Sequence, residues 1–104
     1  LWNKVIKMEN LDCKLLAKEL LGSLYSEGMN FVIYPDGKTE VTPHSAGYFP
    51  IKPLAKIDLS KWYWNSGTLG EYDLNNLSEE DESFIIDYLA SEIEIDIEEN
   101  KKQN

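Results

Sequence analysis

The sequence predicts a small α+β domain in which an antiparallel sheet packs with two helices. Three observations favour this class. Apolar residues recur at helical spacing in two separate segments, a hairpin signal lies between those segments, and the 104 residues match the length of one domain. We therefore expect residues 1–104 to form a single domain, with residues 1–7 and 100–104 as flexible ends.

The first predicted helix covers residues 10–27. Asn10 suits the N-cap position, Asp12 suits the first turn, and Gly28 suits the position where a helix stops. One apolar stripe recurs at helical spacing, and its members are Cys13, Leu16, Ala17, Leu20, Leu21 and Leu24.

A hairpin is predicted for residues 29–42. Aromatic and β-branched residues come first, and Pro35 to Lys38 provide turn chemistry, since proline presets φ and Gly37 tolerates positive φ. Residues 43–54 contain three prolines and a glycine, so we expect an ordered loop there.

A third strand is predicted for residues 55–64, because Ile57 and Leu59 alternate with charged residues. On such a strand Trp62 and Trp64 would share one face and Tyr63 would take the other. These rings either fill the core or form an exposed platform, and the sequence leaves both readings open.

Ser78 opens a second predicted helix over residues 78–92, with carboxylates in its first turn. Its expected buried face consists of Phe84, Ile85, Tyr88 and Leu89. Residues 93–98 then alternate isoleucine with acidic residues, which is the period of a strand. A C-terminal strand over residues 93–98 and a continued helix both stay open.

Charge is strongly uneven along the chain. The protein has 10 lysines, no arginine and 19 acidic residues, for a formal net charge of −9. Residues 1–61 carry a net +1, whereas residues 62–104 carry −10. This distribution disfavours direct nucleic-acid binding, which needs basic residues, and favours a basic protein partner. The absence of arginine, with many Lys, Asn and Ile, suggests an AT-rich gene of a bacterium or phage.

Catalytic chemistry is poorly represented. The chain has one histidine, His44, and one cysteine, Cys13, which lies on the apolar stripe where an inert thiol is common. No metal-binding spacing and no nucleotide-binding motif occurs, so we expect no cofactor, no metal site and no enzymatic activity. A single cysteine and the lack of any long apolar run predict a cytoplasmic protein that does not enter a membrane.

The leading hypothesis is an inhibitor or decoy that engages a basic, nucleic-acid-binding partner. Its predicted partner-binding residues are Trp62, Tyr63, Trp64, Glu71, Asp73, Glu79, Glu80, Asp81, Glu92, Glu94 and Asp96. The alternatives are a small-ligand module, with Trp62, Trp64 and Tyr72 around a cleft that also holds His44 and Glu71, and a structural or accessory subunit. Homodimerisation is left open.

Overall fold

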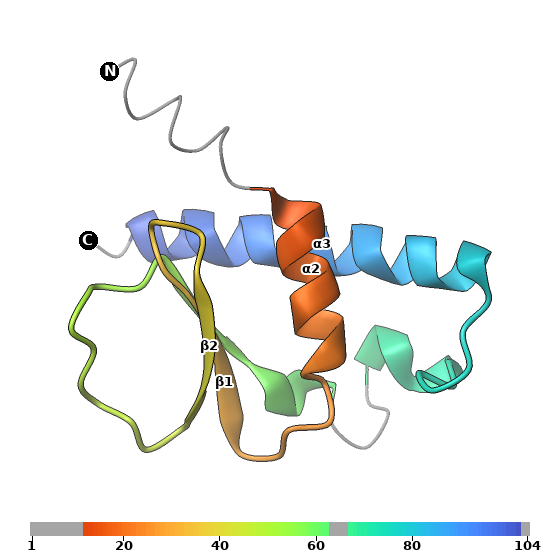
Figure 1. Ribbon diagram of the computed structural model, residues 1–104, viewed down its shortest axis with the longest axis horizontal. Coiled ribbons are helices and arrows are strands. Elements are labelled where there is room, and N and C mark those ends of the chain that lie inside the picture. The colour runs from red at the N-terminus through yellow and green to blue at the C-terminus, as the bar shows by residue number, and fades with distance from the viewer. Residues whose placement is uncertain (1–11, 63–66, 103–104) are drawn as a thin grey trace.

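The computed structural model describes residues 12–62 and 67–102, and it confirms the predicted α+β fold (Figure 1). The elements in chain order are helix α2 (Cys13–Gly22), strands β1 (Met29–Ile33), β2 (Thr39–Pro43) and β3 (Ala55–Asp58), the 3₁₀ turns η1 (Leu59–Lys61) and η2 (Gly67–Glu71), and helix α3 (Glu79–Lys102). Helix α3 runs along the long axis of the molecule, and α2 crosses it (Figure 1).

Helix α2 is shorter than predicted at both ends. It begins at Cys13 because the Asp12 carboxylate caps it, accepting hydrogen bonds from the backbone N–H groups of Lys14 at 3.0 Å and Leu15 at 3.2 Å. It ends at Gly22 rather than near residue 27, and the next six residues lead into β1.

The hairpin is confirmed. β1 is the central strand of a three-stranded antiparallel sheet with the order β2-β1-β3. Phe31 is paired with Val41 on one side and with Ile57 on the other. Gly37 has φ +87°, as the turn requires, and its N–H donates to the Tyr34 carbonyl at 2.9 Å.

The predicted third strand ends early. β3 stops at Asp58, whose carboxylate accepts the Ser60 N–H at 2.9 Å and so starts the 3₁₀ turn η1. The alternation of Ile57 and Leu59 therefore crosses from a strand into a turn, although both side chains are buried.

The C-terminal strand does not form, because residues 93–98 belong to α3. Helical spacing places Ile93 and Ile97 one turn apart and buries both, whereas Ile95 remains 53% exposed. The buried stripe of α3 packs against α2 and β3, and its members are Ile85, Ile86, Leu89, Ala90, Ile93 and Ile97.

The polar end also begins later than predicted. Asn100 is helical, and its side-chain amide donates to the Leu54 carbonyl at 2.8 Å and to the Pro53 carbonyl at 3.3 Å. These bonds tie the last turns of α3 to the segment that enters β3. Residues 1–7, the other predicted flexible end, lie outside the described residues.

Candidate functional site

Most of the acidic charge lies on α3. This 24-residue helix contains ten carboxylates and two lysines, a formal charge of −8. At 1.5 Å per residue it is about 36 Å long. Six of the predicted partner-binding residues are on it: Glu79, Glu80, Asp81, Glu92, Glu94 and Asp96.

The first turn of α3 is built as predicted. The Ser78 hydroxyl accepts the Asp81 N–H at 3.1 Å, which caps the helix. Glu79, Glu80 and Asp81 are exposed beside this end, where carboxylates interact favourably with the helix dipole. Within residues 12–62 and 67–102, no group of three His, Cys, Asp or Glu side chains is arranged to hold a metal ion.

Glu92, Glu94 and Asp96 do not form the single row that a strand would give. Glu92 and Asp96 are one helical turn apart, and Glu92 accepts a salt bridge from Lys61 at 3.3 Å. Glu94 points to a different side of the helix and is exposed. Burial raises the pKa of Asp96, and the neighbouring charges of Glu92 and Glu99 raise it further, against a lowering by Lys61.

A different row of carboxylates lies along the outside of α3. Glu80, Asp87 and Glu94 are spaced by seven residues, about 10.5 Å of helix, and Glu98 follows one turn later. All four are exposed. Two of the four form ion pairs, both of them exposed. Lys14 pairs with Asp87 and Lys101 pairs with Glu98, each at 3.5 Å. The seven-residue spacing is visible in the sequence, but it becomes meaningful only when the helix continues beyond residue 92.

Glu71 and Asp73 lie near the start of this acidic helix. Both are exposed, and the residue between them, Tyr72, packs its ring against Phe84 of α3 with centroids 6.3 Å apart. The Asp73 carboxylate also accepts the Asn75 N–H at 3.1 Å, which shapes the turn before α3. These two predicted site residues therefore extend the acidic surface at its N-terminal end.

Trp62 is a core residue and not an exposed anchor. Its side chain is 3% exposed, and its ring meets Tyr88 edge-on, with centroids 6.5 Å apart and an angle of 83°. Its indole N–H donates to the Tyr88 hydroxyl at 3.3 Å, which satisfies the polar atom. The core interpretation is confirmed for Trp62, whereas Tyr63 and Trp64 lie outside the described residues.

The sequence also placed Phe84 on the buried face of the second helix, which is wrong. Phe84 is 52% exposed and Tyr88 is partly buried, whereas Ile85 and Leu89 are in the core as predicted. The buried stripe is centred one position away from the expected one, because α3 packs against both α2 and β3.

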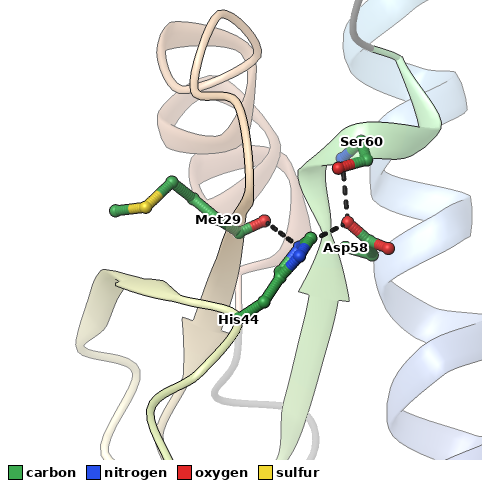
Figure 2. Close-up of polar contacts among 4 residues, drawn as sticks. All are labelled: Met29, His44, Asp58 and Ser60. Atoms are coloured by element: carbon green, nitrogen blue, oxygen red, sulfur yellow. Dashed lines mark hydrogen bonds and ion pairs between the residues drawn. The ribbon is translucent and has the colours of Figure 1, made fainter.

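His44 has partners that the sequence did not predict (Figure 2). Its Nε2 lies 2.8 Å from the Asp58 carboxylate and 3.1 Å from the Met29 carbonyl oxygen. Both partners are acceptors, so Nε2 carries a proton and is shared between them. The contact joins the segment after β2 to the start of β1 and the end of β3.

The Asp58 carboxylate is held in its charged form. Partial burial raises its pKa, but hydrogen bonds from the Ser60 backbone and hydroxyl and from His44 outweigh that effect, and the net pKa is lowered. Burial, followed by the charges of Glu94 and Asp12, raises the pKa of the Cys13 thiol, which makes it a poor nucleophile.

No family model matches the chain, and no curated protein or solved structure matches it either. In the parts of the chain that the structure describes, neither α2 nor α3 is apolar enough over a sufficient length to cross a membrane. The arrangement of side chains alone therefore carries the functional argument.

Proposed function

We propose that this protein is an interaction protein whose acidic α3 surface engages the basic surface of a nucleic-acid-binding partner. More specifically, the proposed protein acts as an inhibitor or decoy that occupies the partner's nucleic-acid site. The observation that carries the proposal is the concentration of ten carboxylates and two lysines on one helix, where eight of the ten acidic residues are exposed.

Electrostatic self-repulsion supports this reading. Like charges along one helix oppose its formation, and a surface that served solubility alone would usually mix both signs. On α3, no salt bridge among the described residues involves any of the four acidic residues of the first turn, or Glu94. A negative surface of this kind steers a basic partner and speeds association, an effect that salt weakens.

The setting that we propose follows from composition. A cytoplasmic protein of a bacterium, a phage or another mobile element fits the single cysteine and the absence of arginine. Such a protein would bind its partner and not nucleic acid, because basic residues are few on the acidic half.

The small-ligand alternative is weakened by the positions of its members. Trp62 is buried and cannot line an open cleft, and the Nε2 proton of His44 is already shared between Asp58 and Met29. The accessory-subunit alternative is retained as an outcome of the experiment below.

The test is an affinity pull-down from a lysate of a low-GC bacterium, eluted by a salt gradient and read by mass spectrometry. A nucleic-acid-binding protein released by salt is expected. An empty bait, or release of a partner that does not depend on salt, would contradict the proposal and favour a structural role.

A charge-matched pair of variants then localises the contact. Glu80→Gln, Glu94→Gln and Glu98→Gln together neutralise three exposed carboxylates of α3. They should slow association with the captured partner by on the order of tenfold at low salt. The control neutralises three exposed carboxylates elsewhere, as Glu19→Gln, Glu27→Gln and Glu40→Gln. Equal losses in both variants would mean that net charge matters and the α3 surface does not.

A further inference from the structure

Helix α3 also carries, between its carboxylates, a line of three large side chains, Phe84, Tyr88 and Ile95, with the small Ser91 among them. Phe84, Tyr88, Ser91 and Ile95 follow the spacing i, i+4, i+7 and i+11, which keeps them on one side of the helix, away from the buried stripe. We name these four residues the α3 seam. Phe84 is 52% exposed and Ile95 is 53% exposed, and these two span about 16 Å of helix.

The seam is held rigidly at its centre. The Tyr88 ring packs against buried Trp62, and its hydroxyl accepts the indole N–H. At one end, Phe84 packs against Tyr72. These large side chains are held in place by Trp62 and Tyr72 and are accessible on their other side. They are therefore pre-organised for a contact, since little side-chain freedom is lost when a partner covers them.

Carboxylates flank the seam on both sides. In heptad terms Tyr88 and Ile95 are a positions, and Phe84 and Ser91 are d positions. The flanking g positions are then Asp87 and Glu94, and the flanking e positions after Tyr88 are Glu92 and Glu99, so all four are acidic. Asp87 and Glu92 already meet Lys14 and Lys61. The Lys14–Asp87 pair is largely exposed and therefore weak, so a partner's cation can replace Lys14.

We infer that the occupant of the α3 seam is a basic amphipathic helix of the partner, with an apolar stripe against the seam and Lys or Arg at its edges. This inference rests on the proposed function and names the element through which the partner would bind. Charge complementarity favours such a helix. Residues at e and g positions set partner choice in paired helices, and carboxylates at these positions pair with cations of the partner. A second copy of α3 would bring like charges together along both edges, which disfavours self-pairing.

The probe is a labelled 21-residue peptide with Leu at a and d and Lys at e and g. A second peptide has the same composition in scrambled order, so that its charge is unchanged and its apolar stripe is lost. Binding to the full chain is measured by fluorescence anisotropy at low and at moderate salt. We expect the patterned peptide to bind at least tenfold more tightly than the scrambled one.

The matched variants exchange one aromatic and one aliphatic residue each. Phe84→Ser with Ile95→Ser removes the exposed seam, and Tyr48→Ser with Ile51→Ser does the same to exposed residues of the loop after β2, which are 83% and 56% exposed. Circular dichroism verifies that both variants are folded. The seam variant should lose at least tenfold in affinity for the patterned peptide, and the loop variant should lose none.

Several outcomes overturn the inference. Equal affinity for the two peptides, or equal affinity of the two variants for the patterned peptide, would mean that charge alone is recognised and no helix docks on the seam. In that case the proposed function would still be supported if binding is sensitive to salt and is weakened by the three Glu→Gln changes on α3. If neither peptide shows salt-sensitive binding, both the inference and the proposed function are contradicted. A dimer in sedimentation that the seam variant abolishes would assign the seam to a second copy.

Discussion

At the scale of single residues, Trp62 shows how a conspicuous residue can be structural. Its neighbours in the chain made it look like a binding platform, yet its ring is 3% exposed and its N–H is satisfied by Tyr88. A chain of 104 residues has few large side chains to fill a core, and burying an aromatic ring contributes more to stability than exposing it.

We predict that Trp62→Ala lowers the free energy of unfolding by about 3–5 kcal/mol, because it leaves a cavity and an unpartnered Tyr88 hydroxyl. Urea denaturation measures this change. Tyr48→Ala is the control, since Tyr48 is 83% exposed and its loss should change stability by less than about 0.5 kcal/mol. Similar values for the two variants would contradict the core position of Trp62.

Asp58 is the second residue whose role can be measured, through the dependence of stability on pH. Its pKa is lowered in the folded protein, although partial burial acts in the opposite direction, because Ser60 and His44 donate hydrogen bonds to the carboxylate. A lowered folded-state pKa means that the charged form stabilises the fold above the unfolded value near 3.9, and that this contribution disappears as the pH falls through the folded value.

We therefore expect Asp58→Asn to be less stable than the wild type above about pH 4, and to approach it on acidification below that pH. The carboxylate is 54% exposed, so screening keeps the difference below about 1 kcal/mol. Urea midpoints measured between pH 3 and 7 report it. A difference that does not change with pH would exclude a role for the charge.

At the scale of elements, the sequence of the C-terminal half of α3 matches both the period of a strand and the period of a helix. Isoleucines at positions 93, 95 and 97 match the period of a strand, and two of them also match a helical stripe that continues from Leu89. The helix is favoured because it buries Ile93 and Ile97 against the rest of the core, while the sheet is completed by β3 at one edge and β2 at the other.

This arrangement predicts unequal effects of identical changes. Ile97→Ala should cost about 2–5 kcal/mol of stability, because Ile97 is 1% exposed. Ile95→Ala should change it by less than about 0.5 kcal/mol, because that side chain is 53% exposed. A strand would place both residues on one face, so equal losses in urea denaturation would argue against the helix.

At the scale of the whole molecule, charge and shape are coupled. The formal charge of −9 is concentrated on α3, which carries −8 and runs along the long axis of the molecule (Figure 1). Repulsion between exposed carboxylates opposes the compact state, and it is screened by salt over about 10 Å at 0.1 M.

We predict that the thermal midpoint rises as sodium chloride is increased from about 0.01 to 0.2 M, because screening relieves this repulsion. Differential scanning calorimetry measures the midpoint. The variant in which Glu80, Glu94 and Glu98 are changed to Gln is the control, and its dependence on salt should be smaller. A midpoint that does not respond to salt would show that the carboxylates are already compensated.

Local chemistry in the sequence was sufficient for the class of fold, the hairpin and the start of α3. The Pro35–Lys38 turn, with Gly37 at positive φ, and the Ser78 cap are interactions between residues at most four positions apart, so the sequence contains all their partners. The acidic character of the second half is likewise a property of composition.

Only the tertiary structure decided where that charge and the aromatic rings lie. The length of α3, the burial of Trp62, the exposure of Phe84 and the contact of His44 with Asp58 each depend on residues 14 to 47 positions apart, or on which face of a helix is covered. Period-two and helical patterns can coexist in one short segment, and packing selects between them. For that reason Glu92, Glu94 and Asp96 do not form the single row that a strand would have given, and the row beginning at Glu80 gained its meaning only from the continued helix.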